Sequence, residues 1–207
     1  MAEHAATRFM FLDFETYVGP EGELKPNLAV VQYDTGEEFV FPSNGVIGQD
    51  VSDELCNFIS QEKPQKFYII AHNFQSFDGM FILKWLFSNG IKNEPMLCGG
   101  KIKNIFVSSL NLYFRNSLAY VPTSLAKFPA VVGFTDVSKG AFPHHFNRSG
   151  NWNNTVPFPQ RHEFDYNKKS EQDRLSFDEW YDTELYKKGG HYTFNQHFVD
   201  YCRQVNF

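Results

Sequence analysis

The sequence predicts an α/β fold in which a central mixed sheet is flanked by helices. Short runs of β-branched and aromatic residues alternate with segments whose apolar residues recur at helical spacing. Two early strand-like runs, 28–34 and 37–41, are separated only by Thr35-Gly36, which indicates an antiparallel pair. The length of 207 residues is that of one domain with a substantial core. Interleaved strands and helices of this kind are typical of a mixed sheet covered by helices.

The N-terminal half carries three clear structural signals. Apolar residues at 51, 55 and 58 share one helical face, and Ser52-Asp53 provides a helix start. The segment 77–88 is apolar almost all round, which indicates a buried helix, and Asn89-Gly90 ends it. The elements predicted in this half are strands at 9–14, 28–34 and 37–41, a helix within 48–61, a strand at 66–72 and a helix at 77–88.

The C-terminal half has weaker patterning and one long irregular stretch. Residues 143–172 are polar and rich in asparagine, without periodicity, so we predict a flexible flap there. A last helix begins at Thr193 or Asn195, and its apolar stripe consists of Phe194, Phe198, Tyr201, Cys202 and Val205. The other elements predicted in this half are strands at 102–107 and 110–117, a short helix at 124–128 and a helix at 177–187.

Composition and charge restrict the classes of function. The 23 phenylalanines predict a phenylalanine-rich interior, and the net charge of −5 excludes steering of nucleic acid by a global basic field. Three widely spaced cysteines form neither a zinc pattern nor a disulfide framework, which indicates a reducing compartment. The N-terminus resembles no signal peptide, and no apolar run reaches the roughly 18 residues of a membrane span. We therefore expect an intracellular protein without membrane contact.

Two carboxylates lie close together in the first predicted strand. Asp13 and Glu15 are two residues apart, so they share one face of the strand with Phe11. Two carboxylates on a buried strand are costly unless a cation neutralises them. Hard oxygen ligands on a rigid strand suit Mg²⁺ or Mn²⁺. The alternative interpretation is an exposed strand that carries two solvated acids.

A third acid follows the next predicted strand. The stretch A-H-N-F-Q-S-F-D, from Ala71 to Asp78, leads into the buried helix, and Asp78 lies at its start, where the helix dipole favours a carboxylate. In this order, D-x-E and A-H-N-x-x-x-F-D resemble the first two exonuclease motifs of family B DNA polymerases. Within this family the pattern resembles the protein-primed branch found in viruses, linear mitochondrial plasmids and related mobile elements, and the resemblance extends from Phe9 to Arg203.

This resemblance implies a ribonuclease H-like exonuclease fold and a two-metal proofreading site that uses Mg²⁺ or Mn²⁺. The implied substrate is the 3′ end of single-stranded DNA. By resemblance, Asp13 binds both metals, Glu15 binds one and orients the attacking water, and Asp78 is the acid of the second motif. Asn73 and Phe77 match residues that contact the terminal nucleotides, Phe77 through the face of a base. As structural alternatives, Asn73 could bond loop backbone and Phe77 could pack in the core.

Three later segments carry the same resemblance. N-S-L resembles the segment that holds single-stranded DNA, with Ser117 and Leu118 matching its ligands and Asn116 standing where aspartate is usual. K-G-A-F resembles a lysine motif of the protein-primed branch, in which Lys139 stabilises the scissile phosphate. Y-C-R-Q resembles the start of the third motif, in which Tyr201 hydrogen-bonds the attacking water. The alternatives are a strand end at Ser117, a solvated Lys139 and core packing of Tyr201.

The third motif departs from the family pattern. Val205 occupies the position four residues after Tyr201 where an acid is expected, and the chain ends at Phe207. A helix turns about 100° per residue, so Asp200 points too far from Tyr201 to substitute for that acid. We therefore expect one exonuclease-like domain over residues 1–207, truncated within the third motif and without the polymerase palm, fingers and thumb. The missing acid predicts weakened activity and a site reduced from two metals to one.

Three functions remain open at this stage. The chain is a metal-dependent 3′–5′ exonuclease of impaired activity, a catalytically inactive nucleic-acid-binding module, or a protein-interaction module derived from such a polymerase. A polymerase domain could follow in a longer gene product, and the oligomeric state is not predicted. His144 and His145 have no Cys or Glu at ligand spacing, so we assign them to structural or surface positions.

Overall fold

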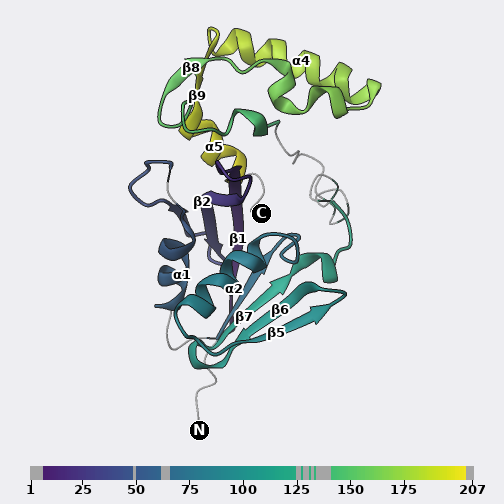
Figure 1. The fold of residues 1–207 in the computed structure, drawn as a ribbon. Coiled ribbons are helices and arrows are strands. Elements are labelled where there is room, and N and C mark those ends of the chain that lie inside the picture. Colours follow the sequence, from purple (N-terminus) through teal and green to yellow (C-terminus); the bar gives the residue numbers. More distant parts are fainter. Residues whose placement is uncertain are drawn as a thin grey trace.

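The computed structural model describes residues 7–48, 50–61, 66–124, 127, 131, 133 and 141–203. Within these residues, seven strands form one mixed sheet in the order β3-β2-β1-β4-β7-β6-β5, and β8 and β9 form a separate pair (Figure 1). The strands are β1 (Thr7–Val18), β2 (Leu24–Tyr33), β3 (Glu38–Phe41), β4 (Lys66–Ala71), β5 (Glu94–Cys98), β6 (Lys101–Val107), β7 (Leu112–Asn116), β8 (Thr155–Pro157) and β9 (His191–Thr193). The α-helices are α1 (Ser52–Ser60), α2 (Asp78–Ser88), α4 (Glu171–Lys187) and α5 (Phe194–Arg203).

The mixed α/β architecture predicted from the sequence is confirmed. β2 and β3 pair in antiparallel fashion, and α1, β4, α2, β6, β7 and α5 lie where the patterns placed them. β5 was not predicted, because its five residues are all exposed and include Pro95, so the edge strand lacks apolar alternation. The predicted helix at 124–128 falls largely outside the described residues. No helix in the described part of the chain is long and apolar enough to cross a membrane.

The prediction of a flexible flap at 143–172 is wrong. This stretch contains β8 and short 3₁₀ turns at His144–Phe146, Arg161–Phe164 and Tyr166–Lys168, and it ends in α4, which begins six residues before the predicted 177. Its large side chains are widely spaced in sequence but bury together with those of α4 and α5. Phe146, Trp152, Phe158 and Phe164 are each at most 8% exposed. Aromatic burial without periodicity therefore orders a segment that looks irregular in sequence.

β1 organises the sheet because it is the longest strand and lies near its middle. It pairs antiparallel with β2 along its length and parallel with β4 from Thr7 to Leu12. The recorded pairing with β4 ends at Leu12–Ala71, so β1 continues past the C-terminal end of its neighbour. Side chains that follow β4 in sequence can therefore approach the second half of β1.

One face of the sheet packs on α1 and α2. Met10, Leu12 and Phe14 alternate along β1 and are buried against this helical layer, with Ile82 and Leu86 of α2. The intervening residues, Phe11, Asp13 and Glu15, are only partly buried and point to the opposite face. The predicted shared face of Phe11, Asp13 and Glu15 is thus confirmed.

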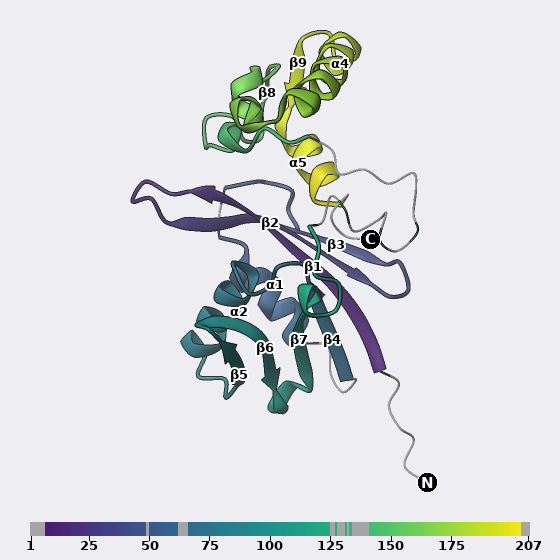
Figure 2. The ribbon, with the colours of Figure 1, turned by 90° about the vertical axis from the view of Figure 1, so that its right-hand side faces the viewer.

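The opposite face of β1 and β2 is covered by a C-terminal lobe formed by residues 141–203. α5 belongs to this lobe and contacts the sheet, whereas α1 and α2 lie on the other side (Figure 2). Leu28 and Val30 of β2 join Phe194 and Phe198 of α5 in a second core, which is rich in aromatic rings as the composition predicted.

A side chain of the lobe completes the irregular part of the β1–β2 ladder. The register shifts between Glu15 and Thr16, and Thr16 then lies opposite Pro26, which has no N–H to donate. Asn147 Nδ2 donates instead to the Thr16 carbonyl at 3.0 Å, and Asn147 Oδ1 accepts from Trp152 Nε1 at 2.7 Å. The lobe is therefore fixed to the sheet close to Asp13 and Glu15.

Candidate metal and nucleic-acid site

A cavity of 430 Å³ lies where β1 passes the end of β4. It collects residues from β1, from the loop after β4, from the start of α2 and from the C-terminal lobe. Its lining consists of Asp13, Phe14, Glu15, Thr16, His72, Asn73, Phe77, Asp78, His144 and Tyr201. Six of the residues predicted from the sequence, the three acids with Asn73, Phe77 and Tyr201, therefore share one cavity.

Asp13 and Glu15 belong to a group of side chains that could hold a metal ion. One ligand atom each from Asp13, Glu15 and Cys202 lie within 4.8 Å of one another. The Cys202 thiol lies 3.7 Å from Asp13 Oδ2 as a donor. Burial raises the pKa of this thiol well above its usual value, and the negative charges of Asp13 and Glu15 add to the effect. The thiol therefore stays protonated, and the two carboxylates are the ligands this cluster offers to a hard cation.

Asp78 approaches the cluster from the start of α2. Its Oδ1 accepts a hydrogen bond from the Phe14 backbone N–H at 3.3 Å, beyond the point where β4 ends. The side chain is only 4% exposed, and burial raises the pKa of Asp78 to about 7. A buried carboxylate is a favourable ligand for a cation, because the cation would offset the cost of ionisation. Asp78 lines the same cavity as Asp13 and Glu15 but lies outside their 4.8 Å group.

The loop before α2 holds Asp78 through close backbone packing. The Gly79 N–H donates to the Phe74 carbonyl at 2.9 Å. A Cβ on Gly79 would lie 2.8 Å from that carbonyl oxygen, which is closer than real Cβ atoms approach. The glycine after Asp78 therefore permits the tight turn that points the acid at β1.

Tyr201 enters the cavity from α5. It is 5% exposed, and its ring stacks on Phe142 with 4.8 Å between centroids. Its hydroxyl lies 3.4 Å from His144 Nε2. Burial raises the pKa of Tyr201 far above its usual value, and Glu15 and Asp13 add to the rise. The hydroxyl is therefore protonated at neutral pH and can donate a hydrogen bond beside the two carboxylates.

Asn73 and Phe77 lie on the solvent side of the acids. Phe77 is 46% exposed, so the core alternative for this ring is wrong. Asn73 has a φ of 57°, in the left-handed region that asparagine tolerates better than most residues. It also lines a second, neighbouring cavity of 650 Å³ together with Leu118, Lys103 and other residues. The two cavities share His72 and Asn73 in their lining and are therefore adjacent; we call the second one the groove.

Ser117 contacts His72, which lines both cavities. It is 8% exposed, and its Oγ lies 2.9 Å from His72 Nδ1. Asn116 accepts from the Leu118 N–H at 3.2 Å, while its Nδ2 is buried without a partner among the described residues. Ser117 therefore supports His72, whereas Leu118 faces the groove itself.

Two predicted positions lie outside the described residues: Lys139 and Val205. Sequence reasoning in turn missed three residues that line or contact the acid cavity. His144 was assigned to a structural or surface role, yet it lines the cavity beside Tyr201, 57 residues away in sequence. Cys202 was placed on the apolar stripe of the last helix, and His72 belonged to a quoted motif without an assigned role. For His144 and Cys202 no spacing signal exists, since their partners are distant in the chain.

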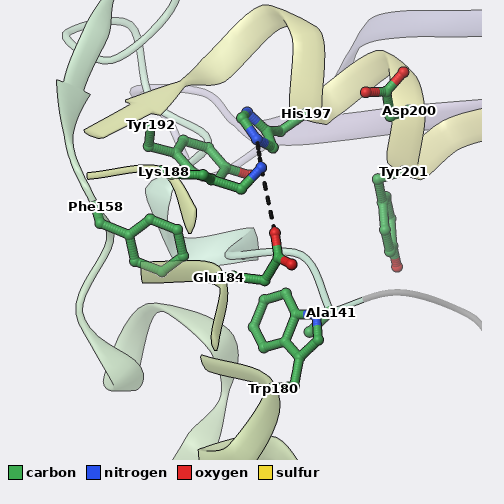
Figure 3. A pocket seen from close by; sticks show the side chains of 9 residues that line it. All are labelled: Ala141, Phe158, Trp180, Glu184, Lys188, Tyr192, His197, Asp200 and Tyr201. Carbon is green, nitrogen blue, oxygen red and sulfur yellow. Dashed lines mark hydrogen bonds and ion pairs between the residues drawn. The ribbon is translucent and has the colours of Figure 1, made fainter. Parts of the chain in front are cut away.

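A third cavity lies on the other side of Tyr201. It has a volume of 200 Å³ and is lined by the nine residues labelled in Figure 3, from Ala141 to Tyr201. Lys188 forms an ion pair with Glu184 at 3.4 Å and hydrogen-bonds His197, so these three polar side chains are partners of one another. Tyr201 thus forms part of the wall of two cavities, one acidic and one mainly aromatic.

Comparisons with known proteins agree with the residue patterns. The profile of the family described as DNA polymerase type B, organellar and viral, matches residues 59–204. A probable DNA polymerase of Agaricus bitorquis is 31% identical over 99 residues, which are 45% of this chain and 12% of that polymerase. The solved structure of the family B DNA polymerase from the archaeon Pyrobaculum calidifontis aligns with 82% of this chain and 22% of its own, at 16% identity and a TM-score of 0.45. The family match spans most of the chain, and the chain belongs to the organellar and viral type B DNA polymerases.

Proposed function

We propose that the chain has the ribonuclease H-like exonuclease fold and a metal-dependent 3′–5′ exonuclease site for single-stranded DNA. The observation that carries this proposal is the single cavity that combines acids of β1 and α2 with Tyr201 and an exposed Phe77. Membership in a DNA polymerase family supports DNA as the substrate.

Asp13, Glu15 and Asp78 would hold the divalent ions. The donor set fits Mg²⁺ or Mn²⁺, because it consists of carboxylates and the nearby thiol stays protonated. A bound divalent ion would activate a water for attack on the terminal phosphodiester and stabilise the leaving oxygen. Asp13 and Glu15 each have a ligand atom within 4.8 Å of the other, so these two carboxylates could share one ion.

The protein side chains would orient the strand around these acids. Phe77 presents a ring to the terminal base, and Asn73 presents its amide to the same nucleotide. Leu118 lines the groove that continues from this point, and Ser117 fixes His72 at its edge. The Tyr201 hydroxyl would donate to the attacking water or the phosphate. Lys139 belongs to this proposal by resemblance alone, as the cation that stabilises the scissile phosphate.

The lack of an acid at position 205 favours a second candidate function. The position four residues after Tyr201 carries an acid in the family pattern, and valine supplies no metal ligand. We propose impaired hydrolysis, with a loss of roughly 10²–10⁴ in rate if one metal-binding acid is missing. In the limit of no hydrolysis, the chain is a nucleic-acid-binding or protein-interaction module that keeps the groove.

A degradation assay tests the exonuclease. A 5′-labelled single-stranded oligonucleotide is incubated with Mn²⁺ and wild-type protein, with Asp13→Ala, and with Glu94→Ala as a control carboxylate on the exposed edge strand β5. We expect stepwise shortening by the wild type and by Glu94→Ala, and no shortening by Asp13→Ala. Equal shortening by Asp13→Ala would refute the site. Oligonucleotide binding without shortening by any protein would favour the binding module.

A further inference from the structure

His144 brings an imidazole ring to the acid cavity from the C-terminal lobe. Its Nε2 lies 3.4 Å from the Tyr201 hydroxyl, and both side chains line the cavity that contains Asp13 and Glu15. The imidazole and the phenol ring meet edge to face, with 5.6 Å between centroids and an interplanar angle of 80°. A ring nitrogen of His144 therefore contacts the hydroxyl that would act on the attacking water or the phosphate.

The turn that carries His144 is anchored on both sides. Before it, the Phe142 ring is 3% exposed and packs against the His144 ring with 5.3 Å between centroids. After it, Asn147 Nδ2 donates to the Thr16 carbonyl of β1 at 3.0 Å. The Asn147 N–H also donates to the His144 carbonyl at 3.3 Å, which closes the 3₁₀ turn. The His144 side chain is exposed, yet its backbone is fixed to the lobe core and to the strand that carries the acids.

The neighbouring histidine shows that this placement is specific to residue 144. His145 belongs to the same 3₁₀ turn, but its Nε2 pairs with Asp165 at 2.7 Å. It does not line the acid cavity among the described residues. His145 therefore stabilises the lobe through a different partner, and it provides a matched control for His144.

The charges around Tyr201 determine which group donates in this contact. The Tyr201 hydroxyl has one proton to donate and lone pairs that accept. Burial raises the pKa of this hydroxyl, and the charges of Glu15 and Asp13 raise it further. Carboxylates accept hydrogen bonds and do not donate them, so the phenol proton is favoured on their side. A lone pair then remains for His144, whose Nε2 carries the proton in this contact.

We infer that His144 is a positioning residue, which donates a hydrogen bond from Nε2 to the Tyr201 oxygen and turns the phenol proton towards the acids. A phenol proton has two orientations in the plane of its ring, and donation towards the acids uses only one of them. A fixed donor at the oxygen selects that orientation before the reaction, which lowers the cost of orienting the group in the transition state. The effect on catalysis rests on the proposed function, whereas the hydrogen bond itself does not.

A double-mutant cycle on the degradation rate tests the contribution to catalysis. His144→Phe keeps a ring against Phe142 but removes the donor. It should lower kcat about 2- to 12-fold with KM unchanged, the range for one hydrogen bond. His144→Gln provides an amide N–H in place of Nε2 and should keep most of the wild-type rate. In a Tyr201→Phe background, His144→Phe should cause no further loss. His145→Phe should degrade the oligonucleotide as the wild type does.

Nitrogen NMR of the metal-free protein in EDTA tests the hydrogen bond without any reaction. Histidine is labelled with nitrogen-15, and spectra are recorded at about pH 8, where an ordinary histidine is neutral. Nε2 of His144, assigned by its loss in His144→Gln, should give the signal of a protonated ring nitrogen. This signal should shift in Tyr201→Phe, which keeps the ring and removes the hydroxyl. It should stay in place in Tyr181→Phe, because the Tyr181 hydroxyl donates to the Pro159 carbonyl elsewhere in the lobe.

The two experiments separate this inference from the exonuclease proposal. A protonated Nε2 that responds to Tyr201→Phe, with no degradation by the wild type, supports the hydrogen bond and counts against the nuclease. An unprotonated Nε2, or one that does not respond to Tyr201→Phe, overturns the inference even if the wild type degrades DNA. Equal losses from His144→Phe with and without the Tyr201 hydroxyl would also overturn it, because His144 would then act independently of Tyr201. If His144→Phe fails to fold, His144→Ala, which shortens an exposed side chain, replaces it in the cycle.

Discussion

Two ionisable groups at the acid cavity, Asp78 and Cys202, have raised pKa values for the same physical reason. Both are buried, and burial raises the pKa of each, so the neutral form of each is favoured when no cation is bound. For the thiol this removes a soft ligand that would otherwise attract zinc. For Asp78 it couples protonation, cation binding and the stability of the fold.

The free energy of unfolding of the metal-free protein should depend on the protonation of Asp78. Its native pKa of about 7 lies above the ordinary 3.8, so the native state binds this proton more tightly than the unfolded state does. The stabilisation is complete below about pH 4 and is lost as the pH rises through about 7, and it amounts to roughly 2–3 kcal/mol between pH 5 and 8. Urea unfolding in EDTA over this range measures it. In Asp78→Asn this component should vanish; an unchanged pH dependence would show that another group causes it.

At the scale of elements, the start of α2 determines whether Asp78 reaches β1. The helix has no side-chain cap, and its first turn is instead held by the loop that folds back under Gly79. Backbone packing in this turn therefore determines where the Asp78 carboxylate lies.

Gly79→Ala should damage the site without changing any ligand. The new Cβ would lie 2.8 Å from the Phe74 carbonyl oxygen, so the turn must open. We expect a loss of about 1–3 kcal/mol in the free energy of unfolding and weaker Mn²⁺ binding. Denaturant titration and calorimetry measure the two effects. Gly150→Ala is the matched control, because a Cβ there meets nothing within 4 Å. Equal effects of both variants would contradict this explanation.

The sequence predicted those parts of the site that depend on local periodicity. Alternation along β1 placed Asp13 and Glu15 on one face, and the apolar segment after Phe77 placed Asp78 at a helix start. The thiol of Cys202 and the ring of His144 could not be predicted, because their positions depend on how α5 and the lobe fold back over β1. The order of residues 143–172 was missed for the same reason, since its aromatic side chains bury only in the assembled lobe.

At the scale of the whole molecule, the second core connects the lobe to the acid cavity. Phe142 packs on Phe194, Phe198 and Tyr201, with ring centroids 5.9, 5.0 and 4.8 Å away. Phe164 lies farther into the lobe, against Phe177 and Trp180. The two phenylalanines are equally buried, at 3% exposure, but only Phe142 touches Tyr201.

Phe142→Ala and Phe164→Ala should therefore separate stability from site geometry. Each removes a buried ring and should cost about 3–5 kcal/mol of unfolding free energy, so assays are run at low temperature where the fold persists. Only Phe142→Ala should also alter the environment of Tyr201 and thereby lower the degradation rate. Denaturant titration and the degradation assay measure the two effects. Identical behaviour of the two variants would mean that the lobe does not support the cavity.

The unequal lengths of β1 and β4 have a consequence for the hydrogen bonds of the backbone. Past Leu12 the ladder with β4 stops, which leaves the rest of β1 with a backbone edge inside the molecule. A buried N–H at such an edge costs free energy unless another group accepts its hydrogen bond. Asp78 accepts from the Phe14 N–H at this edge, in place of a carbonyl of β4. The acid that would hold a cation thus also completes the hydrogen bonding of the strand, so its loss would leave a buried donor unpaired, a cost that no activity assay measures.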